Sequence, residues 1–121
     1  MKRILILDDN EIFLDVTSAV LEEAGYEVLV SNKPHKIERL LEEQSFDLLI
    51  TDIVMPQREG MEIITLMRKA YPSVKVIAVS GQEIAHFDIF TTARCLGASA
   101  TLKKPFHNSV LLNSVNALFS S

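Results

Sequence analysis

The chain of 121 residues is 48% hydrophobic and 23% charged, a balance typical of one folded domain and not of intrinsic disorder. Its formal net charge is −4, which argues against direct binding to nucleic acid, because that binding depends on Lys and Arg neutralising phosphates. No apolar run approaches the ~20 residues of a membrane span. The single cysteine excludes an internal disulfide and suits a reducing compartment. We therefore expect one cytoplasmic domain over residues 1–121.

Five short apolar segments, rich in β-branched residues, are nearly continuous instead of alternating with polar residues. This pattern is typical of parallel strands that are covered on both faces. The predicted strands span residues 4–7, 28–30, 48–51, 74–79 and 98–102.

Stretches of helical length separate these strands, and their apolar residues recur three or four positions apart. Gly25 and Gly97 follow two of these stretches as expected C-terminal caps, while Pro34 suits the first turn of the second helix. Cys95 is expected to be a small buried residue of the fourth helix. The faces expected to pack on the sheet are Ile12, Val16, Ala19 and Val20; Ile37, Leu40 and Leu41; Ile63, Ile64 and Met67; Phe90, Ala93 and Leu96; and Leu111, Leu112, Val115 and Leu118.

The predicted order is a strand followed by a helix, five times over. Strands that alternate with helices predict an α/β fold with a parallel sheet between two helix layers and right-handed crossovers. Five such units are too few for a barrel of eight strands and ~250 residues. The sequence therefore predicts a doubly wound, five-stranded parallel sheet with five helices, a three-layer sandwich.

Polar side chains follow most of the predicted strands. Asp8 and Asp9 follow the first strand, Asp52 the third, Ser80 the fourth and Lys104 the fifth. In an open α/β sheet the functional crevice lies beyond the carboxyl ends of the strands. We therefore expect three carboxylates, a hydroxyl and an ammonium group at one edge of the sheet.

Each of these residues also has a purely structural explanation. Asp9 alone is as well explained as the cap of the next helix, Ser80 as part of a turn, and Lys104 as an exposed loop lysine. The combination favours a site, because clustered carboxylates repel one another unless a cation lies among them. Oxygen ligands that leave room for water are those that Mg²⁺ prefers.

Four segments resemble the receiver domain of two-component response regulators, and together they extend over nearly the whole chain. The most specific features are Asp52 followed by Met55-Pro56 and Gly60, and the sequence Lys104-Pro105-Phe106. The segments are DDNEIFL (8–14), DLLITDIVMPQREGME (47–62), VIAVSG (76–81) and ATLKKPF (100–106). The resemblance implies a flavodoxin-like sheet with the strand order 2-1-3-4-5.

The resemblance also implies a phosphoacceptor. Asp52 would accept a phosphoryl group from a sensor histidine kinase or a histidine phosphotransfer protein, and the phosphorylated domain would act on an output domain or partner protein. Asp8, Asp9, Asp52 and the backbone carbonyl of Val54 would bind Mg²⁺, which neutralises charge on the transferring group.

Two further residues would contact the phosphoryl group. The lysine with this role in the family immediately precedes a proline, which selects Lys104 over Lys103, and its peptide bond to Pro105 would be cis. The hydroxyl of Ser80 would bond another phosphoryl oxygen.

Thr101 departs from the family pattern. Many receivers have Tyr or Phe three residues before the lysine, and that aromatic ring swings inward when the phosphoryl group is engaged. A threonine cannot fill the same volume. We therefore expect a smaller conformational response, or one that uses other residues such as the loop after Ser80.

Two alternative functions remain open at this point. A receiver-like scaffold that binds proteins and never accepts phosphate is favoured by Thr101 and opposed by the intact set of polar residues. A phosphohydrolase of the haloacid dehalogenase type also combines aspartate, Mg²⁺, Ser or Thr, and Lys. That family has Asp-x-Asp after its first strand, where this chain has Asp8-Asp9-Asn10, and it usually adds a cap domain.

Overall fold

The computed structural model describes residues 1–53, 60–81 and 89–120. Its five strands form one sheet with the order β2-β1-β3-β4-β5, and all neighbouring strands are parallel. The strands are β1 (Arg3–Leu7), β2 (Glu27–Ser31), β3 (Leu48–Asp52), β4 (Lys75–Ser80) and β5 (Ala100–Lys103). The predicted strands, their order and their direction are therefore confirmed.

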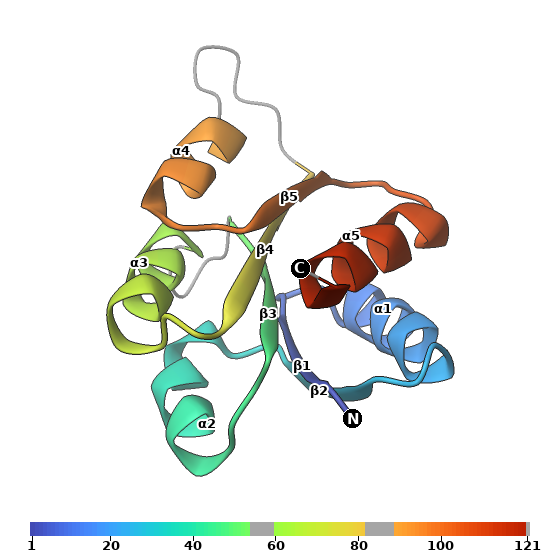
Figure 1. Ribbon diagram of the computed structural model, residues 1–121, viewed down its shortest axis with the longest axis horizontal. Coiled ribbons are helices and arrows are strands. Elements are labelled where there is room, and N and C mark those ends of the chain that lie inside the picture. Colours follow the sequence, from blue (N-terminus) through green and yellow to red (C-terminus); the bar gives the residue numbers. More distant parts are fainter. Residues whose placement is uncertain (54–59, 82–88, 121) are drawn as a thin grey trace.

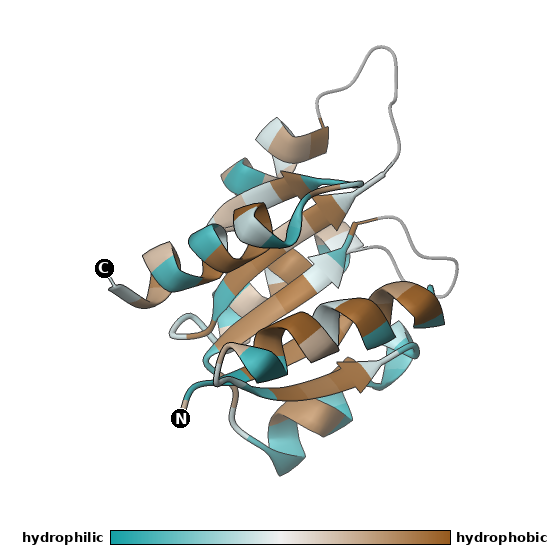
Figure 2. Ribbon diagram, turned by 90° about the vertical axis from the view of Figure 1, so that its right-hand side faces the viewer, coloured by the Kyte–Doolittle hydropathy of each residue, from teal (hydrophilic) through white to brown (hydrophobic). Residues whose placement is uncertain are grey.

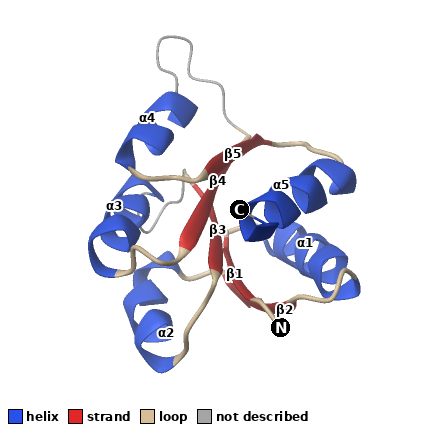
Figure 3. Ribbon diagram, viewed as in Figure 1, coloured by secondary structure: helices blue, strands red, loops and turns tan. Residues whose placement is uncertain are grey.

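The helices cover both faces of this sheet, as Figures 1 and 3 show: α1 and α5 lie on one face, and α2, α3 and α4 on the other. The helices are α1 (Glu11–Glu23), α2 (Ile37–Glu43), α3 (Gly60–Ala70), α4 (Ile89–Leu96) and α5 (Asn108–Ser120). Pro34 begins a short 3₁₀ turn, Pro34–Lys36, directly before α2. The three-layer sandwich is confirmed. Among the helices described, none combines the length and the apolar character that crossing a bilayer demands.

Two hydrophobic cores lie on opposite faces of the sheet, because successive side chains of a strand point to opposite sides. Leu5 and Leu7 of β1 belong to the core under α2, α3 and α4. Ile4 and Ile6 belong to the core under α1 and α5. All four are fully buried. Figure 2 shows the strands as largely hydrophobic, with paler and hydrophilic residues toward some of their ends, which agrees with the burial of the three central strands β1, β3 and β4.

Four of the five predicted helix faces are confirmed, since their residues are buried or pack against one of the two cores. The face predicted for α1 is wrong except at Val20, which packs against the core under α1 and α5. Ile12 is 76% exposed and Val16 is 54% exposed, whereas Leu14, Thr17 and Leu21 are buried. Helix α1 has apolar residues on two sides, so helical spacing alone cannot decide which side packs on the sheet.

Cys95 is also placed differently from the prediction. It lies on α4 but is exposed, because Ile89 and Ala93 supply the buried side of this short helix. The two predicted helix ends are confirmed: Gly25 and Gly97 have φ angles of 100° and 127°, which are easily adopted only by glycine.

Gly60 fixes the approach of α3 to the end of β3. Its N–H donates to the carbonyl of Ile53 at 2.8 Å. A Cβ atom at this position would lie 2.6 Å from Ile53 Cα and 2.9 Å from its carbonyl oxygen, and closer still to the carbonyl oxygen of Asp52. Since these atoms belong to the backbone, the strand end itself would have to move.

The substitution Gly60→Ala should therefore destabilise the fold. We expect the free energy of unfolding to fall by about 1–3 kcal/mol, the usual range for overpacking, in urea denaturation monitored by circular dichroism. Gly81→Ala is the matched control, because its Cβ would make only ordinary contacts with Lys104, the nearest at 3.5 Å; its change should stay within about 0.5 kcal/mol. Equal stability of Gly60→Ala and the unsubstituted protein would contradict this account.

Candidate functional site

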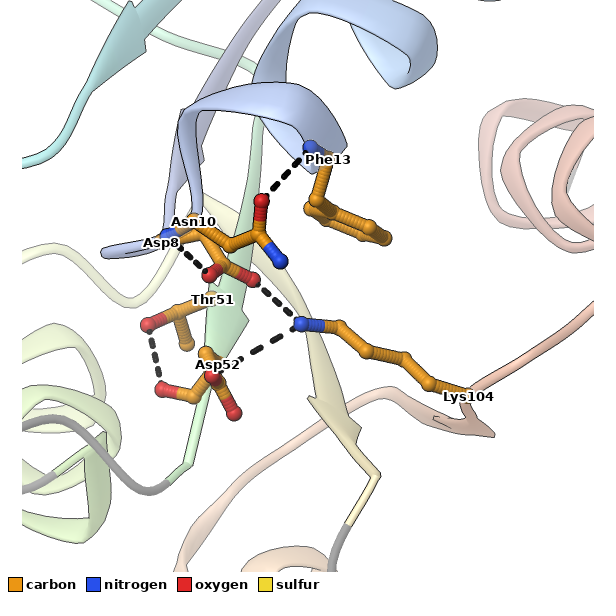
Figure 4. Close-up of polar contacts among 6 residues, drawn as sticks. All are labelled: Asp8, Asn10, Phe13, Thr51, Asp52 and Lys104. Carbon is orange, nitrogen blue, oxygen red and sulfur yellow. Dashed lines mark hydrogen bonds and ion pairs between the residues drawn. The ribbon is translucent and has the colours of Figure 1, made fainter.

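Three carboxylates lie together at the carboxyl edge of the sheet. Asp8 follows β1, Asp9 is next to it, and Asp52 is the last residue of β3. One carboxylate oxygen from each lies within 4.8 Å of the other two. Because β1 and β3 are adjacent and parallel, their ends bring these side chains together as predicted. Figure 4 shows Asp8 and Asp52 facing the same lysine.

Asp8 is completely buried, and both of its carboxylate oxygens accept hydrogen bonds. Oδ1 accepts the N–H of Asn10 at 2.9 Å, and Oδ2 accepts from the ammonium group of Lys104 at 2.6 Å. The side chain of Asn10 in turn accepts the N–H of Phe13 at 3.1 Å and caps α1. The cap of α1 is therefore Asn10 and not Asp9, whose exposed carboxylate belongs to the acidic cluster.

Among the described residues, Lys104 is the cation that pairs with the cluster. Its Nζ lies 2.6 Å from Asp8 Oδ2 and 3.7 Å from Asp52 Oδ2, and its side chain is 21% exposed. The following peptide bond to Pro105 is cis, as the resemblance implied. Lys103 is exposed at the end of β5, so the structure brings Lys104, and not its neighbour, to the carboxylates.

Ser80 ends β4 at the same edge and is 1% exposed. Its carbonyl accepts the N–H of Lys104 at 2.9 Å. The backbone at the end of β4 therefore holds the start of the lysine loop, residues 104–107 between β5 and α5. Val54, whose carbonyl was the remaining predicted metal ligand, lies outside the described residues.

The cluster suits a hard divalent cation. Three carboxylates and one ammonium give a formal charge of −3 + 1 = −2, which a divalent ion would balance. All donors are oxygens, and oxygen ligands are those of Mg²⁺ and Ca²⁺. The residues present therefore fit the metal that the sequence predicted.

Phe13 was not predicted as part of the site. The Nζ of Lys104 lies 4.0 Å from the centroid of its ring, within the range of a cation–π interaction. The sequence offers no direct signal for this contact, since Phe13 is one of many apolar residues in α1.

Thr101 is hydrogen-bonded to α4. Arg94 donates from Nη1 to the hydroxyl of Thr101 at 3.0 Å, and from Nη2 to the hydroxyl of Thr91 at 3.3 Å. The position where many receivers have an aromatic ring is therefore tied to α4 through a hydroxyl group.

A five-stranded parallel sheet with acidic side chains around one lysine at its carboxyl edge defines a class of signalling domain. The family described as "Response regulator receiver domain" matches residues 4–116. The chain belongs to this family, whose members are the receiver domains of two-component systems.

Solved structures show the same fold over nearly the whole chain. A CheY-like receiver domain protein from Methanospirillum hungatei superimposes with a TM-score of 0.91 at 32% identity, covering 99% of this chain and 94% of the other. The beryllofluoride-activated NtrC4 receiver domain, solved as a dimer, has a TM-score of 0.91 at 30% identity, covering 99% and 98%.

The curated relatives that this chain matches differ greatly in length. The chain is 30% identical to the receiver protein CpdR of Brucella abortus over 98% of this chain and 97% of that protein. It is 32% identical to the sensor kinase/phosphatase CqsS of Vibrio cholerae over 96% of this chain but only 17% of that protein. Its match to NtrC of Azospirillum brasilense spans 24% of that regulator.

The pairing of Lys104 with buried Asp8 predicts a larger stability effect at Lys104 than at its exposed neighbour Lys103. Lys104→Met keeps much of the apolar stem but leaves a buried carboxylate without its ammonium partner. We expect the free energy of unfolding in chelator-treated buffer to fall by about 1–3 kcal/mol, measured by urea denaturation. Lys103→Met should change it by no more than about 0.5 kcal/mol. Equal losses in the two variants would show that the ion pair contributes nothing specific.

Proposed function

We propose that this receiver domain accepts a phosphoryl group on the carboxylate of Asp52. The donor would be the phosphohistidine of a sensor histidine kinase or of a histidine phosphotransfer protein. The observation that supports this most directly is the position of the Asp52 carboxylate, 3.7 Å from the ammonium of Lys104 and within the acidic cluster. A carboxylate beside a fixed cation is a suitable nucleophile for a negatively charged phosphoryl group.

In the proposed reaction, an oxygen of the Asp52 carboxylate attacks phosphorus and forms an acyl phosphate. The bond between phosphorus and the imidazole nitrogen breaks, and its electron pair stays on that nitrogen. Because phosphoryl transfer involves little other covalent chemistry, the protein contributes mainly positioning and charge.

The other site residues would provide that positioning. Asp8, Asp9 and Asp52 would hold Mg²⁺ together with the carbonyl of Val54, and the bound ion would supply positive charge against the phosphoryl oxygens. Lys104 would pair with one phosphoryl oxygen, and the hydroxyl of Ser80 would bond another. The charge of −2 in the cluster supports this role for a divalent ion, since the incoming phosphoryl group adds further negative charge.

The relatives support a partner that reads the phosphorylated domain. The chain spans almost all of CpdR but only about a quarter of NtrC, a DNA-binding transcriptional regulator. The effect of phosphorylation would therefore pass either to a separate protein or to an output domain in the same polypeptide. The beryllofluoride-activated form of the similar NtrC4 receiver suggests a convenient probe for this state.

Incubation with acetyl phosphate and Mg²⁺ tests the proposal directly. Intact-mass spectrometry should show the gain of one phosphoryl group per chain, because the carboxylate of Asp52 becomes an acyl phosphate. Asp52→Asn should abolish the gain, since an amide is not a comparable nucleophile, and chelation of Mg²⁺ should suppress it. Asp15→Asn is the control: this aspartate is exposed on α1 and should be dispensable for a small donor.

The same experiment separates the alternatives. Turnover of many donor molecules by each chain would favour the phosphohydrolase. No gain of mass, under conditions in which another receiver is phosphorylated, would favour the scaffold.

The contact between Arg94 and Thr101 predicts that the structural change on activation is confined mainly to the surroundings of Asp52 and Ser80. With beryllofluoride and Mg²⁺, we expect large amide chemical-shift changes near Asp52 and Ser80. Smaller changes are expected along α4 and β5, because a threonine fills too little volume to reproduce the movement of an aromatic ring. The measurement is a pair of two-dimensional NMR spectra, in which the shifts near Asp52 confirm binding. Large changes throughout α4 and β5 would reject this expectation.

A further inference from the structure

Within the described part of the chain, the ammonium group of Lys104 has two different kinds of neighbour. On one side are the carboxylates, with Asp8 Oδ2 at 2.6 Å and Asp52 Oδ2 at 3.7 Å. The aromatic ring of Phe13 is the other neighbour, and its centroid lies 4.0 Å from Nζ. Figure 4 shows the ring of Phe13 beside the end of the lysine side chain, next to Asp8.

Phe13 is held in place by two contacts, one of its backbone and one of its ring. Its backbone N–H donates to the side chain of Asn10, the cap of α1, at 3.1 Å. Its ring makes an edge-to-face contact with Phe106, with centroids 6.0 Å apart and planes at 88°. Both rings are partly buried and pack against the core under α1 and α5. The cap of α1 and the second residue after Lys104 thus hold the ring against which Lys104 lies.

We propose that Phe13 is a positioning residue for phosphoryl transfer, whose ring holds the Lys104 ammonium at the rim of the carboxylate cluster. The role in transfer rests on the proposed function of Asp52, whereas the contact with Lys104 does not. The face of an aromatic ring attracts a cation through its quadrupole. It also keeps water away from that side of the ammonium group, so the N–H groups are directed toward the carboxylates and an incoming phosphoryl oxygen.

This positioning matters because Lys is a flexible point charge on a four-carbon stem. Ordering such a side chain costs conformational entropy, and part of that cost would otherwise fall on the transfer step. A lysine already held by the ring and by Asp8 needs little rearrangement to meet the phosphoryl group. A role in packing alone, by contrast, would depend on the volume of Phe13 and not on the electrons of its ring.

A graded change in the electron density of the Phe13 ring distinguishes a role in positioning Lys104 from a role in packing alone. Phe13 is replaced site-specifically by mono-, di- and trifluorophenylalanine, which progressively weaken the attraction of the ring face for a cation while changing the volume little. The first readout is the NMR signal of the Lys104 side-chain nitrogen and terminal carbon in protein free of Mg²⁺. The second is the rate of phosphorylation by acetyl phosphate with Mg²⁺. The same series at Phe106 is the matched control, because this ring contacts Phe13.

We expect the Lys104 signal to move in proportion to fluorination at Phe13 and to stay nearly constant in the Phe106 series. The phosphorylation rate should fall by about three- to tenfold at the trifluoro end, the size expected for a partly desolvated cation–π contact. Phe13→Leu should slow the reaction similarly, and Phe13→Tyr, which keeps the ring face, should restore most of the rate at comparable thermal stability.

A Lys104 signal that does not respond to fluorination of Phe13 overturns the proposal, whatever happens at Asp52. So does a phosphorylation rate that follows only the thermal stability of the variants. If the signal responds but the unsubstituted protein accepts no phosphoryl group, the proposed function fails and the role of Phe13 in transfer fails with it.

Discussion

The structure of this site depends on one electrostatic constraint, a cluster of three carboxylates of which two face the ammonium group of Lys104. Asp8 is fully buried, and a buried charge is tolerated only when it is paired and hydrogen-bonded. Lys104 and the N–H of Asn10 satisfy both of its oxygens. Asp9 and Asp52 then exceed what one lysine can balance, so the cluster retains a preference for further positive charge. Among the described residues, this imbalance gives the cluster the composition that a divalent cation prefers.

The fold meets this constraint with residues that are far apart in the chain. Asp8 and Lys104 are separated by 96 positions, yet both follow strands of the same parallel sheet. The N–H of Lys104 bonds the carbonyl of Ser80, which anchors the lysine loop to the end of β4. Gly60 allows α3 to begin directly against the end of β3. The strand ends therefore determine the positions of the charges.

The features that depend on the strands could be predicted from the sequence. Buried parallel strands are nearly continuous apolar runs, and the residue after each run must lie at the carboxyl edge, so Asp8, Asp52 and Ser80 could be located. The rotation of α1 could not be predicted, although the faces of the other four helices could. Helix α1 has apolar residues on two sides, and its burial of Leu14 and not Ile12 is decided by tertiary packing. The exposure of Cys95 has the same origin, because a short helix needs only a narrow buried side.

Rotation of α1 also explains why Phe13 was overlooked and why it lies where it does. Asn10 has two roles: its N–H donates to Asp8 Oδ1, and its side chain accepts the N–H of Phe13. One residue therefore sets both the orientation of the buried carboxylate and the first turn from which the ring projects. Because Asp8 and the Phe13 ring are both neighbours of the Lys104 ammonium, the cap of α1 fixes two sides of the lysine at once. The helix cap and the charge cluster are parts of the same local structure.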